Sequence, residues 1–225
     1  MSYQIAIDGP AGAGKSTIAK AVAKELSFVY VDTGAMYRAM ALLCIRSGVS
    51  GADETAVTGL CNGAQVEITY IDGAQAVILN GENVNPFIRT QEVGDMASTI
   101  SVYKGVRDKL VKLQQELGTK ENVVMDGRDI ASAVLPNANL KVYLDADVKV
   151  RAKRRYDELK AKGQEADLAV IEQEVKDRDY RDMHRENSPL VRVPEAVLVD
   201  SSNMTIKEVT DKIIELANDN GIPRH

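Results

Sequence analysis

Short apolar runs alternate along most of the chain with stretches in which apolar residues recur at helical spacing. The runs rich in β-branched and aromatic residues are typical of strands and cover residues 3–7, 28–31, 123–126, 140–145 and 196–200. The stretches with helical spacing predict helices over residues 15–26, 35–44, 91–117, 147–162, 168–185 and 205–218. We expect the helix over 91–117 to be broken near residues 103–105. Strands that alternate with helices in this way predict an α/β fold with a five-stranded parallel sheet.

A different pattern occupies the middle of the chain. Between residues 65 and 84, short alternating strands are separated by Asp72-Gly73 and Asn80-Gly81, which are strong hairpin signals. The pattern predicts a small antiparallel meander. We therefore expect a core domain of residues 1–49 and 96–225, with residues 50–95 as an inserted subdomain and a short lid at about residues 155–167.

The turn between the first strand and the first helix carries the clearest chemical signal. Residues 9–16 have the spacing G-x-x-x-x-G-K-S of a phosphate-binding P-loop, which stands here between a predicted strand and a predicted helix. Glycines let backbone N–H groups point at phosphate oxygens, and the helix N-terminus adds positive potential. Lys15 is expected to reach the β- and γ-phosphates, and the Ser16 hydroxyl to ligate Mg²⁺. The expected ATP-binding residues are Gly9, Pro10, Ala11, Gly12, Ala13, Gly14, Lys15, Ser16 and Thr17.

Three predicted strands end in aspartate, at Asp126, Asp145 and Asp200. Ligands of open α/β sheets bind at the carboxyl ends of the strands, where a carboxylate can hold Mg²⁺ through water beside a P-loop. Position alone does not choose among the three, because strand-end aspartates commonly cap turns. Asp126 is favoured because Gly127-Arg128-Asp129 follows it directly and places more chemistry at the same edge.

Arginines provide the second chemical signal. Arg178, Arg181, Asp182 and Arg185 have the spacing of one helix face, where three arginines would repel one another unless anions lie opposite. They suggest a second phosphate-bearing substrate, and hence transfer between two phosphates rather than hydrolysis. The alternative is a solvated face on which these arginines pair with Asp177, Asp179 and Glu186. A further basic group comprises Arg151, Arg154 and Arg155.

Composition and charge exclude several other functions. A formal net charge of −5 is unlike a general nucleic-acid or membrane surface. With two histidines, His184 and the terminal His225, a Ser-His-Asp hydrolase or a histidine-ligated metal is hard to assemble. Cys44 and Cys61 lack C-x-x-C spacing and are expected to be reduced thiols. We expect a cytoplasmic monomer without nucleic-acid or membrane partners.

Taken together, four segments resemble bacterial-type cytidylate kinases, which are P-loop nucleoside monophosphate kinases. These segments are the P-loop at 9–16, Asp-Thr-Gly-Ala-Met-Tyr-Arg at 32–38, Asp-Gly-Arg-Asp at 126–129 and Arg-Asp-Tyr-Arg-Asp at 178–182. The resemblance runs from about residue 5 to residue 216. It implies a P-loop kinase core, and the meander resembles the enlarged nucleoside monophosphate-binding subdomain of this family.

The resemblance also implies a reaction and a set of site residues. The reaction is transfer of the ATP γ-phosphoryl group to CMP or dCMP with Mg²⁺, with Ser16 and, through water, Asp126 at the metal. CMP would be bound by Thr33, Arg38, Ser98, Arg107, Arg128, Asp129, Arg178 and Asp182. Within this set Arg38 and Arg128 would hold the phosphate, Ser98, Arg107 and Asp129 the cytosine edge, and Arg178 and Asp182 the sugar. The catalytic residues would be Lys15, Arg128, Arg181 and Arg185, with one of the three arginines at 151, 154 and 155 also at ATP.

Two alternative functions remain open at the level of sequence. The first is another P-loop kinase, acting on AMP, UMP or dephospho-coenzyme A. Asp129 and Arg107 distinguish it from a kinase of CMP, because recognition of a carbonyl in place of an amine would require a hydrogen-bond donor at position 129. A non-catalytic nucleotide switch would not need the second arginine-rich site.

Overall fold

The computed structural model describes residues 2–71 and 73–223 and divides the chain into two compact units. Unit 1 comprises Met1–Tyr30 and Gly118–His225, and unit 2 comprises Val31–Leu117. Asp72 of the predicted Asp-Gly turn lies outside the described residues.

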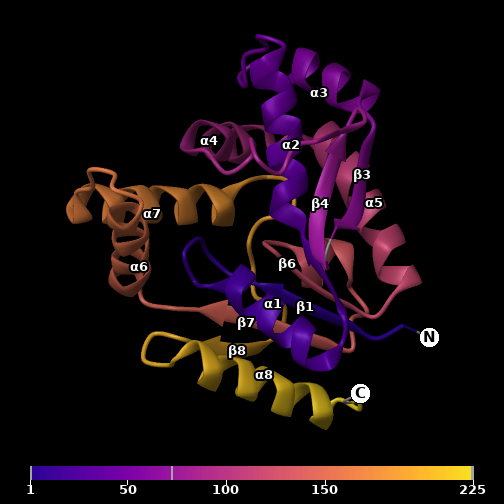
Figure 1. Ribbon diagram of the computed structural model, residues 1–225, viewed down its shortest axis with the longest axis vertical. Coiled ribbons are helices and arrows are strands. Elements are labelled where there is room, and N and C mark those ends of the chain that lie inside the picture. The colour runs from indigo at the N-terminus through magenta and orange to yellow at the C-terminus, as the bar shows by residue number, and fades with distance from the viewer. Residues whose placement is uncertain (1, 72, 224–225) are drawn as a thin grey trace. The chain divides into compact units, whose positions relative to one another are not determined.

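The parallel sheet predicted from the strand pattern is present, in the order β2-β6-β1-β7-β8 (Figure 1). Its strands are β1 (Gln4–Asp8), β2 (Val29–Asp32), β6 (Val123–Gly127), β7 (Leu140–Asp145) and β8 (Val197–Asp200). The central strand β1 pairs in parallel with β6 on one side and β7 on the other, so Ile7 lies opposite Asp126. This register brings the ends of β1 and β6 to one edge, next to the P-loop.

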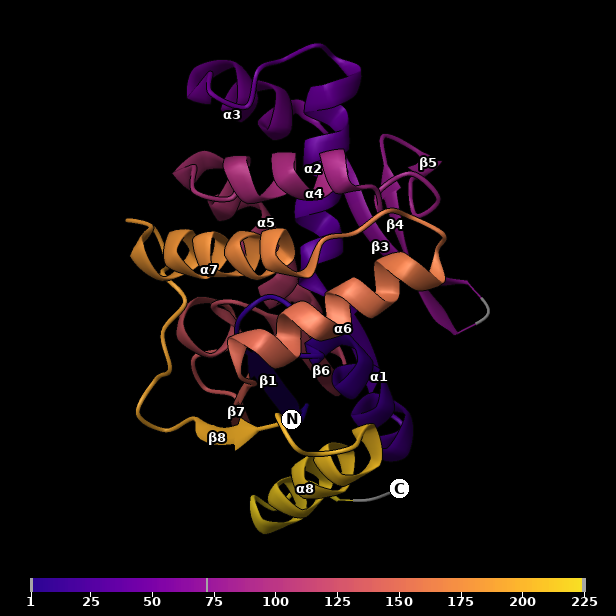
Figure 2. The ribbon, with the colours of Figure 1, turned by 90° about the vertical axis from the view of Figure 1, so that its left-hand side faces the viewer.

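The described residues of unit 1 form four α-helices and one π-helical turn. They are α1 (Lys15–Leu26), η1 (Ile130–Val134), α6 (Val148–Ala161), α7 (Leu168–His184) and α8 (Ile206–Asp219). Helix α1 packs against β6 and α8, where apolar residues such as Ile18, Val22 and Ile213 form one buried core with the sheet. Helices α6 and α7 pack against each other, as Figure 2 shows.

Unit 2 contains the predicted antiparallel meander, formed by β3 (Val66–Ile71), β4 (Ala74–Leu79) and β5 (Glu82–Asn83). Its helices are α2 (Thr33–Arg46), α3 (Glu54–Gly63), α4 (Gln91–Ile100) and α5 (Lys104–Lys120), the last of which continues into unit 1. The helix expected over 91–117 is broken, as predicted, but the break spans residues 101–103, and Lys104 and Gly105 already belong to α5. The expected insertion, residues 50–95, lies inside this unit, which extends further on both sides because α2 and α5 share one apolar core with the meander.

Candidate active site

The P-loop connects β1 to α1 through backbone conformations that glycine adopts readily. Gly9 has φ +152°, and a Cβ built there would lie 2.0 Å from the carbonyl oxygen of Leu144. Gly14, the N-cap of α1, is in the left-handed region with φ +89°. A side chain at Gly9 would clash with β7, and one at Gly14 would strain the backbone, so this loop conformation requires glycine at both positions.

Lys15 is the first residue of α1 and is largely buried. Its Nζ donates a hydrogen bond to the carbonyl oxygen of Pro10 at 2.7 Å. Burial lowers the pKa of Lys15 well below its usual range, and the charge of Arg128 lowers it further, whereas Asp126 and Asp182 act in the opposite direction. Lys15 therefore lies in the electrostatic field of charged residues at the end of β6 and on α7.

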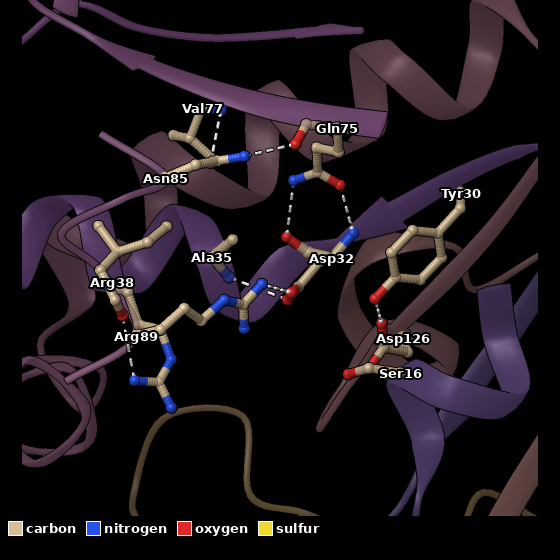
Figure 3. A network of polar contacts seen from close by, with 11 residues as sticks. Ser16, Tyr30, Asp32, Ala35, Arg38, Gln75, Val77, Asn85, Arg89 and Asp126 are labelled. Carbon is tan, nitrogen blue, oxygen red and sulfur yellow. Dashed lines mark hydrogen bonds and ion pairs between the residues drawn. The ribbon is translucent and has the colours of Figure 1, made fainter. Parts of the chain in front are cut away.

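Asp126 and Ser16 form the oxygen-rich part of this site. Ser16 Oγ donates to Asp126 Oδ2 at 2.9 Å, and Tyr30 Oη donates to Asp126 Oδ1 at 2.8 Å (Figure 3). Mg²⁺ prefers oxygen ligands such as hydroxyls and carboxylates, so Ser16 and Asp126 fit the ion that the P-loop implies. The structure thus brings the favoured strand-end aspartate to the P-loop serine.

The other two strand-end aspartates have local partners. Asp145 Oδ1 accepts from the backbone N–H of Ala146, and Asp200 Oδ1 accepts from the backbone N–H and hydroxyl of Ser202. Both therefore cap turns, which is the ordinary role of an aspartate at a strand end.

Arg128, which directly follows β6, forms an ion pair with Asp182 of α7. Arg128 Nε lies 2.8 Å from Asp182 Oδ2. Burial alone would raise the pKa of Asp182, but its charge interaction and hydrogen bond with Arg128 outweigh burial and hold this pKa below its usual value. The carboxylate is therefore ionised and holds the guanidinium of Arg128 in place.

The arginine face expected on α7 is divided by the tertiary structure. Arg178 is half-buried and Asp182 buried, whereas Arg181 is exposed and its Nε donates to the backbone oxygen of Asp177 at 3.4 Å. Arg185 follows the helix end as its C-cap, with extended backbone. Its Nη2 lies 3.7 Å from Asp129 Oδ1, and both side chains are under one-tenth exposed.

The alternative of a solvated arginine face is therefore wrong for Asp179 and Arg185. Asp179 is buried and pairs with Arg151 at 2.6 Å. Sequence spacing placed Asp179 among surface partners because it cannot show that α6 covers this side of α7.

The three arginines of α6 have three different environments. Arg151 is buried and donates to the carbonyl oxygens of Ala146 and of Ala11 in the P-loop. Arg154 is half-buried and donates to Ser201 O at 2.8 Å and, more weakly, to Ala13 O at 3.4 Å. Arg155 pairs with Glu158 on the same helix. Arg151 and Arg154 thus contact the P-loop.

The remaining predicted CMP residues belong to unit 2. Thr33 is buried at the start of α2, and Arg38, further along this helix, donates to the carbonyl oxygen of Ile88 at 3.3 Å. Ser98 is half-buried on α4. Arg107 is buried on α5, donates to Ser101 O at 3.3 Å and lies over the ring of Tyr37.

Asp32 organises the start of α2 in this unit. Its Oδ1 caps the helix by accepting from Ala35 N at 3.0 Å, and its Oδ2 pairs with Arg89 at 2.5 Å (Figure 3). The side chain of Gln75 bonds both backbone groups of Asp32, at 2.6 and 3.1 Å. The meander is thereby tied to the helix that carries Thr33 and Arg38.

The sequence analysis did not single out Tyr30, Gln75, Arg89 or Asp8, which take part in these networks. Tyr30 reads as an ordinary strand aromatic. Asp8, before the P-loop, accepts hydrogen bonds from the backbone N–H groups of Ile130 and Ala131 at 2.8 and 2.7 Å. The sequence signal for Asp8 is an aspartate at the end of a predicted strand, which Asp126, Asp145 and Asp200 share.

Comparison with known proteins agrees with this arrangement. The profile of the family described as Cytidylate kinase matches residues 5–219. The cytidylate kinase of Caldicellulosiruptor bescii is 47% identical over 212 residues, which cover 94% of each chain. That of Bacillus velezensis is 46% identical over 212 residues, covering 94% of this chain and 95% of the other.

Solved structures support the fold at lower similarity. Shikimate kinase from Acinetobacter baumannii has a TM-score of 0.51 at 17% identity, with 99% of this chain and 97% of that chain covered. Shikimate kinase from Bacteroides thetaiotaomicron has a TM-score of 0.50 at 14% identity, with 96% and 98% covered. The P-loop kinase fold is shared with these proteins, and the sequence match over nearly the whole length places the chain in the cytidylate kinase family.

Proposed function

We propose that this kinase transfers the γ-phosphoryl group of ATP to CMP and dCMP. The observation that carries the proposal is the family match over residues 5–219, which includes all four segments expected to bind substrates. Cytidine differs from uridine by an exocyclic amine in place of a carbonyl, and a carboxylate such as Asp129 is an acceptor suited to that amine.

On the ATP side, residues 9–17 would bind the phosphates, with Lys15 at the β- and γ-phosphates. Ser16 and, through water, Asp126 would hold Mg²⁺, which when bound neutralises charge on the phosphates. Arg154 is the α6 arginine we favour for ATP, because it is half-buried between Ala13 and Ser201. Arg151 already contacts Ala146, Ala11 and Asp179, so we expect it to stabilise the P-loop rather than bind ATP.

On the acceptor side, Arg38 and Arg128 would hold the CMP phosphate together with Thr33. Ser98, Arg107 and Asp129 would read the cytosine edge, and Arg178 and Asp182 would contact the sugar. Arg181 and Arg185 would neutralise charge on the transferring group. For Arg185 this requires that it exchange its present partner Asp129, 3.7 Å away, for phosphate oxygens.

A coupled assay of ADP release with ATP and Mg²⁺ tests the proposal against CMP, dCMP, UMP, AMP and GMP. We expect rapid turnover of CMP and dCMP, slow turnover of UMP and none of the purine nucleotides. Turnover of UMP or AMP ahead of CMP would favour another P-loop monophosphate kinase. If none of these nucleotides is turned over, dephospho-coenzyme A is tested as a further acceptor. No turnover of any of them with ATP still bound would favour a nucleotide switch.

The variant Asp129→Asn tests base recognition within the same assay. An amide keeps an acceptor oxygen but adds donors, so the preference for CMP over UMP should fall by about 10-fold or more, in line with a lost charge-assisted hydrogen bond. Asp211→Asn is a matched control, because Asp211 is exposed on α8 and pairs with Lys207. An unchanged CMP preference in Asp129→Asn would contradict the assigned role.

A further inference from the structure

The carboxylate of Asp126 is held from both sides. Ser16 of α1 donates to Oδ2 at 2.9 Å, and Tyr30 of β2 donates to Oδ1 at 2.8 Å (Figure 3). Asp126 itself lies in β6, whose residues are all buried, and is 5% exposed. A buried carboxylate with a donor at each oxygen has little freedom to rotate, so its orientation depends on both donors.

Tyr30 is well placed to be the fixed donor of the two. Its ring is half-buried on a strand of the same sheet as Asp126, and the ammonium of Lys20 lies over this ring, 5.4 Å from its centroid. The hydroxyl is therefore positioned by an aromatic side chain with two rotatable bonds and a cation on its face. Ser16, by contrast, is the residue whose oxygen is expected to turn towards Mg²⁺.

We propose that Tyr30 is a positioning residue for the metal site: its hydroxyl fixes Asp126 Oδ1 so that Oδ2 faces Ser16 and the water of bound Mg²⁺. This inference rests on the proposed use of Mg²⁺ with ATP, and not on the identity of the acceptor. Groups that orient metal-binding side chains typically contribute 10–100-fold to metal affinity. Tyr30 acts on the ion through Asp126 and touches no substrate.

Tyr30→Phe removes the hydroxyl and keeps the ring. The experiment is Mn²⁺ binding to the protein–ADP complex, followed by electron paramagnetic resonance, alongside ADP binding in EDTA by calorimetry. We expect Tyr30→Phe to weaken Mn²⁺ binding by about 10–100-fold while ADP affinity in EDTA stays within about 2-fold of the wild type. In steady-state assays the Mg²⁺ concentration for half-maximal rate should rise by a similar factor.

Two further variants separate positioning from packing. Tyr3→Phe is the matched control, because Tyr3 is half-buried in the same unit and stacks on Phe28 away from the P-loop, and it should leave Mn²⁺ binding unchanged. In an Asp126→Asn background, Tyr30→Phe should have little additional effect on Mn²⁺ binding, because the group through which it acts is altered.

The proposal is overturned if Tyr30→Phe binds Mn²⁺ as the wild type does, or if it weakens ADP equally with and without metal, which would indicate packing alone. It is also overturned if the effect persists in full in the Asp126→Asn background. If the wild type does not turn over CMP but Tyr30→Phe weakens Mn²⁺ binding as expected, the result would count against the proposed acceptor and leave the role of Tyr30 intact.

Discussion

Arg151 Nη2 and Asp179 Oδ2 lie 2.6 Å apart in an ion pair whose side chains are 4% and 11% exposed. The same guanidinium donates to Ala146 O and to Ala11 O. One buried arginine therefore joins the P-loop, α6 and α7, and these are the elements that carry most of the proposed site of unit 1.

Arg151→Met should destabilise the protein by about 3–5 kcal/mol, because it leaves the Asp179 carboxylate buried without its partner. The measurement is the free energy of unfolding in urea. The double variant Arg151→Met/Asp179→Leu should recover much of this loss, since no uncompensated charge remains. A double variant as unstable as the sum of the two single variants would show that the pair is not the main effect.

Asp8→Asn should change how stability depends on pH. Burial raises the pKa of Asp8 to about 6, and the nearby charge of Asp129 raises it too, while hydrogen bonds from Ala131 and Ile130 act in the opposite direction. An unfolded aspartate titrates near 3.9, so between about pH 6 and pH 4 the folded protein takes up a proton that the unfolded chain does not. The contribution of Asp8 to stability therefore grows as pH falls through 6, by up to about 3 kcal/mol.

The check is the free energy of unfolding of both proteins from pH 7 to pH 4.5. As pH falls, the free energy of unfolding of the wild type should rise relative to that of Asp8→Asn. Parallel curves over this range would mean that Asp8 has no raised pKa.

Gly9→Ala should abolish ATP binding and destabilise the fold. A methyl group at this position would meet Leu144 O at 2.0 Å, which demands a backbone shift in β7 or in the P-loop. Gly221→Ala is the control, because Gly221 has φ +74° and open space around it. The control should lose about 1–2 kcal/mol from backbone strain alone and bind ATP normally. Thermal unfolding and ATP titration measure the two effects, and equal losses would argue against the clash.

Thr205→Ala should destabilise α8 by about 0.5–2 kcal/mol. Thr205 and Glu208 form a capping box, in which Thr205 Oγ1 accepts from Glu208 N at 3.2 Å and the Glu208 carboxylate accepts from Thr205 N at 2.8 Å. Thr205→Ser preserves the cap and should stay close to the wild type in the same urea titration. Equal effects of the two substitutions would locate the loss in the methyl group instead.

Among residues 2–71 and 73–223, no helix combines the length and the apolar character needed to cross a membrane.

Local sequence by itself determined the parallel sheet, the P-loop, the meander and the break near residue 103, because each depends on periodicity, glycine spacing or turn residues within a short window. The four segments at the strand ends and on α7 likewise identified the family, and the comparisons confirmed it. These features could be predicted because neighbouring residues alone specify them.

The sequence favoured Asp126 among the strand-end aspartates, but only the tertiary structure showed that it contacts Ser16 of the P-loop and which arginine supports the loop. Asp126 lies 110 residues from Ser16, and Arg151 lies 140 residues from Ala11. The division of the α7 face has the same origin, since Asp179 is buried by its partner on α6 while Arg181 stays exposed. Such contacts depend on how distant segments pack, and side-chain spacing along one helix or strand carries no information about the partner that covers it.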